Sequence, residues 1–266
     1  MRGTLIMKKY NKIGFIGCGK MAGAIIKGIG GDNIIASKSS PDNLEETSKR
    51  LGVEITLDNK YLTKVSDVIF IAVKPNQVEG VLEEIKEFIT PEKLLVSVAA
   101  GVTTGFIKNI IKSDRVVRVM PNTPVLVGEG MSGICGDKEE DVNLVKSMME
   151  KIGKCIVVDE SQIDIVTAIS GSGPAFFYKV INDIARAGEK LGLDYEKSLL
   201  LSIQTAIGSA KMALNREISM EELISNVATK GGCTRVGVDV MEKVNTEQIF
   251  YDVIKDTTEK AKALGK

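Results

Sequence analysis

Gly14-Phe15-Ile16-Gly17-Cys18-Gly19-Lys20-Met21-Ala22-Gly23 contains the most informative spacing in this sequence. The stretch follows a short apolar run and opens a helical pattern, so Gly17-x-Gly19-x-x-Ala22 has the context of a dinucleotide-binding turn. Gly17 permits the tight turn, Gly19 lets the backbone approach a pyrophosphate, and Ala22 allows close packing of helix on strand. The alternative is a plain glycine-rich turn in another doubly wound fold. The flanking strand and helix patterns favour the dinucleotide site.

Around this stretch, short β-branched runs alternate with amphipathic stretches, as they do in βαβ units of a parallel sheet. The continuous apolar run at 68–73 is typical of a central strand covered by helices on both faces. We expect strands at 12–16, 33–37, 53–57, 68–73, 93–98, 115–120, 130–135 and 155–158. The sequence therefore predicts an α/β Rossmann domain with a mostly parallel, doubly wound sheet over residues 1–162.

From about residue 163 the strand patterns stop. Apolar residues such as Phe177, Ile181 and Ile184 recur at helical spacing after Pro174. We predict a second, all-α domain over residues 163–266.

Several helix ends carry capping signals. Ser40 followed by Pro41 predicts the start of a helix, and Gly52 predicts its end. Thr103 is a further N-cap candidate. The helical domain has two capping boxes, the second weaker: Ser219-x-x-Glu222 and Asn245-x-x-Gln248.

The composition excludes several classes of function. The 266 residues include 35 Lys+Arg against 35 Asp+Glu, so the chain lacks the basic field that draws nucleic acid or anionic lipid. It has no histidine, which excludes Ser-His-Asp and Cys-His hydrolases and every His-ligated metal site. We expect no metal, no nucleic acid and no membrane among its ligands.

The cysteines indicate a compartment. Four cysteines are widely separated without a C-x-x-C motif, which favours reduced thiols in the cytoplasm. The apolar stretch at 5–7 is too short for a secretory signal, and no segment reaches the roughly 18 apolar residues of a spanning helix. Either Met1 or Met7 is the true start.

The choice of cofactor depends on the end of the second strand, where NAD-preferring sites place a carboxylate. Here the sequence reads Ser37-Lys38-Ser39-Ser40, whose hydroxyls and ammonium suit a 2′-phosphate. We therefore predict NADPH as the cofactor, with NADH as a weaker alternative. The other reading of Lys38 is a solvated loop lysine.

Two further segments concentrate small polar groups and backbone freedom: 120–124, Met-Pro-Asn-Thr-Pro, and 229–234, Thr-Lys-Gly-Gly-Cys-Thr. Glycines followed by a hydroxyl residue at a helix start present several N–H donors and one hydroxyl, which suits a carboxylate ligand. Ordinary loop and capping chemistry is the alternative for either segment alone.

Taken together, the motifs resemble those of pyrroline-5-carboxylate reductase, the last enzyme of proline synthesis, from about residue 12 to 264. The matching motifs are Gly14-Phe15-Ile16-Gly17-x-Gly19, Ala72-Val73-Lys74-Pro75, Val98-Ala99-Ala100-Gly101-Val102, Arg118-x-Met120-Pro121-Asn122-Thr123-Pro124, Ser170-Gly171-Ser172-Gly173-Pro174-Ala175-Phe176 and Gly231-Gly232-Cys233-Thr234. The resemblance implies NADPH-dependent reduction of 1-pyrroline-5-carboxylate to L-proline. It also implies an intertwined dimer built by the helical domain, often assembled into pentamers of dimers, with substrate bound near the dimer interface.

The resemblance also implies site residues. Cofactor contacts fall on Gly17, Cys18, Gly19, Lys20, Met21, Ser37, Asn59, Val73, Lys74, Ala100 and Asn226, to which the 2′-phosphate argument adds Lys38. Substrate contacts fall on Glu160, Asn226, Gly231, Gly232, Cys233 and Thr234. The sequence departs from the commoner family loop at Thr229-Lys230, where Ser-Pro is usual, and at Cys233, where a smaller or hydroxyl residue is usual. Neither change removes a backbone donor.

The implied chemistry agrees with the missing histidine. A cyclic imine can enter already protonated, so the enzyme must mainly align two rings and exclude water. Thr234 is the predicted catalytic residue, with its hydroxyl on the ring nitrogen, while the glycine amides hold the carboxylate. Cys233 has no activating partner in the sequence and reads as a small packing residue. Glu160 read without the family is a surface carboxylate.

Two other functions compete. One is a β-hydroxyacid dehydrogenase, a similar NADP-linked reductase in which a helical lysine acts as the acid, a role open to Lys179. The other is a non-catalytic cofactor-binding paralogue, against which the intact loop at 231–234 counts.

Overall fold

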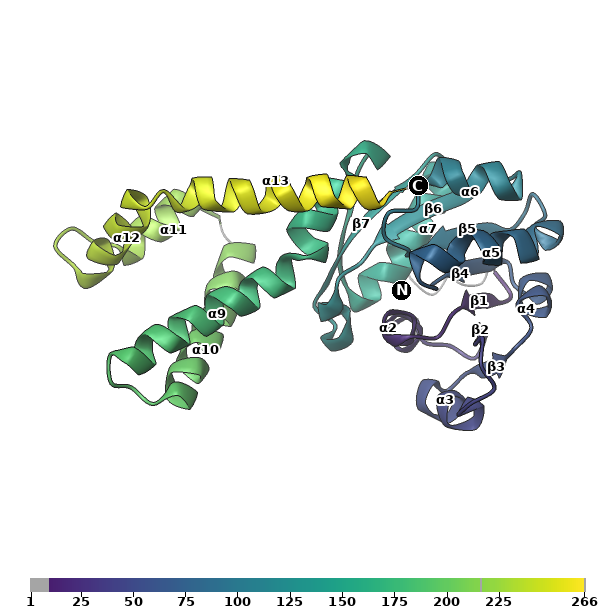
Figure 1. Ribbon diagram of the computed structural model, residues 1–266, viewed down its shortest axis with the longest axis horizontal. Helices are drawn as coiled ribbons and strands as arrows, with labels where there is room; N and C mark the ends of the chain where they lie inside the picture. Colours follow the sequence, from purple (N-terminus) through teal and green to yellow (C-terminus); the bar gives the residue numbers. More distant parts are fainter. Residues whose placement is uncertain (1–9, 216, 266) are drawn as a thin grey trace. The chain divides into compact units, whose positions relative to one another are not determined.

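The computed structural model describes residues 10–215 and 217–265 and divides them into two compact units (Figure 1). The first unit runs up to Ser172 and includes the C-terminal segment from Asp256, and the second is Gly173–Lys255. The predicted division into domains 1–162 and 163–266 stays a prediction. The alternative starts at Met1 and Met7 lie outside the described residues.

The first unit is built on an eight-stranded sheet in the order β3-β2-β1-β4-β5-β6-β7-β8. Neighbouring strands are parallel except for β6 and β7, which are antiparallel. The strands are β1 Ile13–Ile16, β2 Ile34–Ser37, β3 Glu54–Thr56, β4 Val68–Ile71, β5 Leu94–Ser97, β6 Val116–Met120, β7 Gly130–Gly136 and β8 Gly153–Val157. The predicted doubly wound, mostly parallel sheet is thus confirmed, each strand within about two residues of its expected position.

Helices cover both faces of the sheet, which explains the continuous apolar strands. All four residues of β4 are fully buried, and Phe70 stacks on Phe15 of β1 with 4.5 Å between ring centroids. The helices are α2 Lys20–Ile29, α3 Leu44–Leu51, α4 Asn59–Val65, α5 Pro75–Ile85, α6 Thr104–Ile111, α7 Glu139–Met149 and α8 Ile163–Val166. Short turns of helix complete the unit at η2 Lys86–Phe88, η3 Thr123–Val127, η4 Glu150–Ile152, η5 Glu160–Gln162 and the π-helical η6 Thr167–Gly171.

The strand order predicts a ligand crevice at the carboxyl ends of the central strands. From β1 the chain proceeds to β2 on one side and returns to β4 on the other. Ligands of open α/β sheets bind outside the carboxyl ends of the strands at such a reversal. The loops after β1, β2 and β4 therefore border this crevice.

The predicted start of α3 was wrong. The helix begins at Leu44, after Asn43 in the left-handed conformation, and not at Pro41. The segment before it is held as a turn, because the Lys38 ammonium and the Ser40 hydroxyl both bond Asp42. The end of the helix at Gly52, with φ +69°, is confirmed.

The second unit is helical in its described residues, as predicted: α9 Gly173–Lys190, α10 Tyr195–Leu214, α11 Met220–Val227, α12 Cys233–Lys243 and the first part of α13 Thr246–Leu264. Ser219 and Asn245 accept the predicted capping bonds from the N–H groups of Glu222 and Gln248, as Thr103 does from Phe106 in the first unit. Among the described residues, no helix combines the length and apolar character that crossing a membrane requires.

Candidate active site

The turn after β1 has the geometry of a phosphate-binding loop. Gly17 has φ +96°, and a Cβ there would lie 2.7 Å from the carbonyl oxygen of Ala72, so the turn requires glycine. Gly19 precedes α2 without a side-chain cap, and a Cβ on it would meet nothing within 4 Å. Ala22 is buried on the sheet side of the helix. The turn thus leaves the N-terminus of α2 open to a pyrophosphate.

A cavity of about 570 Å³ lies at the carboxyl ends of β1, β2 and β4, a size typical of small-molecule sites. Eight predicted cofactor residues line it: Gly17, Cys18, Gly19, Ser37, Lys38, Asn59, Val73 and Lys74. Four do not: Lys20 lines a separate hollow beside α2, Met21 packs against the core, Ala100 is exposed after β5, and Asn226 belongs to the second unit. The cavity therefore fits the adenosine and phosphate part of a dinucleotide.

Polar side chains connect three elements around this cavity. The Ser37 hydroxyl at the end of β2 donates to Asn59 Oδ1 at 2.6 Å, and Asn59 Nδ2 donates to Glu84 Oε2 at 2.8 Å. Asn59 is thereby fixed between the sheet and α5, facing the cofactor cavity.

The sequence interpretation missed the contribution of α5. Gln77, Val81 and Glu84 line the cavity at a spacing that places them on one face of the helix. That periodicity, directly after Val73-Lys74-Pro75, was the signal available in the sequence.

The loop after β2 places the predicted positive charge, Lys38, at the rim of the cavity. Lys38 and three serines line the cavity there, and the Lys38 ammonium donates to the backbone carbonyl of Asp42. Burial raises the pKa of the Cys18 thiol, and the positive charges of Lys38 and Arg50 only partly offset this. Cys18 is therefore a neutral thiol rather than a nucleophile.

The second unit holds the predicted substrate loop between α11 and α12. Gly231 has φ +78°, and Gly232 precedes α12 in an extended conformation without a side-chain cap. Cys233 and Thr234 form the exposed first positions of α12, and Asn226 is exposed near the end of α11. This arrangement presents uncapped backbone N–H groups and one hydroxyl together, which suits a carboxylate on a small ligand.

Glu160 lies in the first unit, and both of its carboxylate oxygens have partners there. Oε1 accepts from the Thr104 backbone N–H at 2.7 Å and Oε2 from the Thr104 hydroxyl at 2.6 Å. Arg118 Nη1 lies 3.5 Å from Oε1. Its role as a substrate contact stays a prediction.

Two other features bear on the alternatives. Lys179 is exposed on α9 and forms an ion pair with Asp183 at 2.6 Å, one turn along the same helix.

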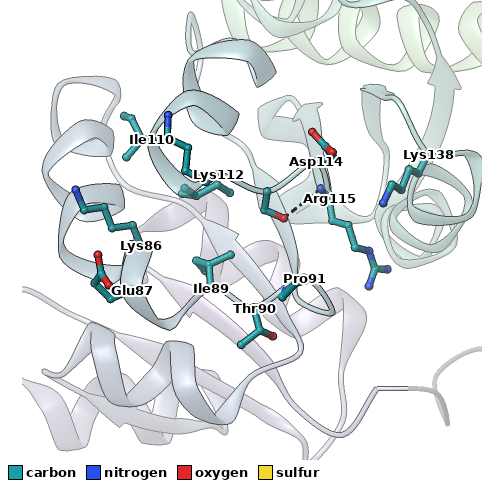
Figure 2. Close-up of a pocket in the computed structure, with 12 residues that line it drawn as sticks. Lys86, Glu87, Ile89, Thr90, Pro91, Ile110, Lys112, Asp114, Arg115 and Lys138 are labelled. Atoms are coloured by element: carbon teal, nitrogen blue, oxygen red, sulfur yellow. Dashed lines mark hydrogen bonds between the residues drawn. The ribbon is translucent and has the colours of Figure 1, made fainter.

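A hollow of about 610 Å³ (Figure 2) is lined by Lys86, Lys112, Arg115 and Lys138. It lies near the amino ends of β5 and β6, at the opposite end of these strands from the cofactor cavity. It contains none of the predicted site residues.

Comparison with known proteins distinguishes these alternatives. Residues 160–264 match the family model for pyrroline-5-carboxylate reductase dimerisation, and residues 12–101 match the model for NADP oxidoreductase, coenzyme F420-dependent. Over 265 residues the chain is 37% identical to the pyrroline-5-carboxylate reductase of Methanosarcina acetivorans, covering 96% of this chain and 98% of the relative. The chain belongs to the pyrroline-5-carboxylate reductase family.

Other relatives agree with membership of the pyrroline-5-carboxylate reductase family. The Bacillus subtilis pyrroline-5-carboxylate reductase 1 is 33% identical, covering 96% of this chain and 89% of the relative. Among solved structures, the Coxiella burnetii reductase aligns with a TM-score of 0.91 at 35% identity, covering 96% and 99% of the two chains. The Plasmodium falciparum enzyme, solved with NADP bound, aligns with a TM-score of 0.83 at 33% identity, covering 96% and 98%.

Likeness to the competing dehydrogenase class extends to the fold alone. A 3-hydroxyisobutyrate dehydrogenase of Mycobacterium tuberculosis aligns with a TM-score of 0.52 at 14% identity. The resemblance to pyrroline-5-carboxylate reductase drawn from the sequence motifs is therefore confirmed, and the C-terminal region is of a self-associating type.

Proposed function

We propose that this protein reduces 1-pyrroline-5-carboxylate to L-proline with NADPH. The observation that carries the proposal is the near full-length identity to pyrroline-5-carboxylate reductases, on a chain whose β1 turn and cavity suit a dinucleotide. When bound, the reduced nicotinamide supplies a hydride to the electrophilic imine carbon. The protonated ring nitrogen then keeps the electron pair of the C=N bond as the secondary amine of proline.

The chain's own residues bind and orient the reactants. The turn at Gly17 and Gly19 holds the pyrophosphate, and Lys38 with the adjoining serines holds the 2′-phosphate. In the substrate loop, the N–H groups around Gly232 hold the carboxylate and the Thr234 hydroxyl accepts a hydrogen bond from the ring N–H. No imidazole is required, because the substrate arrives protonated.

The direct test is the loss of NADPH absorbance when 1-pyrroline-5-carboxylate is added to purified protein. Turnover to proline supports the proposal. A protein that binds NADPH but reduces only the oxo acids that correspond to short hydroxy acids, or nothing, would support one of the two competing functions instead.

The rim after β2 predicts a preference for NADPH over NADH, measured as kcat/KM for each. Lys38→Glu is expected to shift the ratio toward NADH by roughly 10- to 100-fold, since a hydrogen bond to a charged group contributes about 1.5–3 kcal/mol. The carboxylate would also repel the 2′-phosphate.

Lys49→Glu is the matched control for Lys38→Glu. Lys49 is largely exposed on α3 and pairs only weakly with Glu45, 3.7 Å away, outside the cofactor cavity. The control makes the same charge change and should leave the cofactor ratio unaltered. A wild-type enzyme that clearly prefers NADH would overturn the cofactor assignment.

The helices of the second unit support an obligate homodimer. In a single chain these helices leave large apolar side chains exposed to water, and a second chain would cover them. They are Phe177, Ile184, Leu191, Leu200, Leu201, Met212, Val236, Val240 and Tyr251. Light scattering at low protein concentration should therefore give at least a dimeric mass. A folded and active monomer would contradict both the dimer and the placement of substrate near its interface.

Two finer points belong to the same proposal. The family resemblance implies assembly of five dimers into a decamer, which the mass measurement also tests. The four cysteines, all unpaired, favour a cytoplasmic location.

A further inference from the structure

Arg118 is a buried cation for which the proposed reaction has no role so far. It lies in the middle of β6 and is 3% exposed. Its Nη1 lies 3.5 Å from Glu160 Oε1, and its Nη2 lies 4.0 Å from Asp164 Oδ1. Among the described residues, Nη2 has no hydrogen-bond partner. One guanidinium thus faces two carboxylates, which stand one helical turn apart.

Stability alone does not explain this arginine. Removing a guanidinium from water is costly, and the cost is poorly offset when one nitrogen has only a long contact to its counter-ion. Apolar side chains in place of the arginine and both carboxylates together would pack into the same space without that cost. The charge is therefore best explained by what it holds in place.

The carboxylate that Arg118 holds is bonded to the start of another element. Both oxygens of Glu160 accept hydrogen bonds from Thr104, the first residue of α6. Residues 98–103, which connect β5 to α6, end at this anchored position and carry Ala100, a predicted cofactor contact. Arg118, Glu160 and Thr104 thus form a chain from the middle of the sheet to this loop.

The same loop is confined from a second side. Gly101 has φ +73°, and a Cβ there would lie 2.9 Å from the carbonyl oxygen of Leu264. Gly101, Arg118 and Glu160 also share the wall of a cavity of about 310 Å³ with the C-terminal segment. The loop is therefore fixed between the Glu160 anchor and the end of α13.

The position of this loop matters for one half of the cofactor. A dinucleotide lies across the crevice of a doubly wound sheet, with one mononucleotide over each half. The turn at Gly17 and the residues after β2 serve the adenosine half, so the loop after β5 lies on the nicotinamide side. We infer that Arg118 is a positioning residue which, through Glu160 and Thr104, fixes loop 98–103 for the nicotinamide half of NADPH.

This inference rests on the proposed function, and Arg118→Met tests it in the full-length protein. The variant should bind adenosine 2′,5′-bisphosphate, which lacks nicotinamide, as tightly as the wild type, while its affinity for NADPH falls. The NADPH affinity is measured from the fluorescence of its nicotinamide, and the bisphosphate affinity by isothermal titration calorimetry. The kcat for 1-pyrroline-5-carboxylate should fall by roughly 10- to 100-fold, because a small displacement of one reactant is enough for such a loss.

Arg115→Met is the matched control. Arg115, labelled in Figure 2, directly precedes the same strand and is also mostly buried. It pairs with the buried carboxylate of Asp141 near the amino end of β6. Both substitutions remove a guanidinium from a carboxylate partner, so both should lower the melting temperature. Only Arg118→Met should lower the affinity for NADPH while leaving the affinity for adenosine 2′,5′-bisphosphate unchanged.

Arg118→Lys guards against a variant that fails to fold. It keeps the charge without the forked geometry, and it should recover part of both the NADPH affinity and kcat. Equal losses of NADPH and bisphosphate binding, or unchanged kinetics in a folded Arg118→Met protein, would overturn the inference. A wild type that does not reduce 1-pyrroline-5-carboxylate would instead refute the proposed function, while the comparison of the two affinities would still test the role of Arg118.

Discussion

Gly17→Ala is expected to weaken NADPH binding by roughly 100-fold. The new Cβ would come 2.7 Å from the backbone oxygen of Ala72 at φ +96°, so the turn must move away from β4. Moving the turn withdraws the N–H groups of α2 from the pyrophosphate. Losing two hydrogen bonds to a charged group, at roughly 1.5 kcal/mol each, gives a change of that size. Titration of NADPH fluorescence measures it.

Gly30→Ala is the control for Gly17→Ala, because it lies at the other end of the same helix. Gly30 has φ +63° and ψ 168°, so alanine is strained there as well, yet a Cβ would meet no atom within 4 Å. Both variants should lower the melting temperature, and only Gly17→Ala should lose cofactor affinity. Normal NADPH binding by a folded Gly17→Ala protein would show that the pyrophosphate does not sit on this turn.

The strands could be predicted because each is a local apolar signal. β4 is buried along its whole length, and its sequence is apolar without interruption. The start of β8 did not follow from the local pattern. The strand begins at Gly153, two residues before the predicted start, because Gly153 pairs with Gly130 of β7. A Cβ on Gly153 would lie 2.0 Å from the carbonyl oxygen of Gly130. Contact with a distant strand set that boundary, so the local pattern missed it.

The turn at Gly17 could also be predicted from a local sequence pattern, whereas the surroundings of Glu160 could not. Gly17 and Gly19 are assigned to the cofactor through their own backbone, so their spacing alone was sufficient to predict the turn. Glu160 acquires its partners from positions 56 and 42 residues away, Thr104 and Arg118. Read alone it suggested a surface carboxylate, and the fold shows both of its oxygens in use.

Thr234→Ala is expected to lower kcat/KM for 1-pyrroline-5-carboxylate by roughly 5- to 150-fold. Thr234 stands at the second position of α12, exposed and beside the uncapped N–H groups that we assign to the substrate carboxylate. One hydrogen bond to a positioned polar atom contributes about 1–3 kcal/mol, which gives the stated range. Complete loss is not expected, because the imine arrives protonated and needs no proton from threonine. Steady-state kinetics at saturating NADPH measures the effect.

Two further substitutions at position 234 separate the hydroxyl from the shape of the side chain. Thr234→Ser keeps the hydroxyl and should retain most of the activity, while Thr234→Val keeps the shape and should resemble Thr234→Ala. NADPH affinity should stay unchanged in all three, because we assign its phosphates to the Gly17 turn of the first unit. An unaltered kcat/KM in Thr234→Ala would show that Thr234 does not bind the substrate and has only a structural role at the start of α12. Total inactivity with normal NADPH binding would instead require that its hydroxyl move a proton, since the loss of one hydrogen bond cannot account for it.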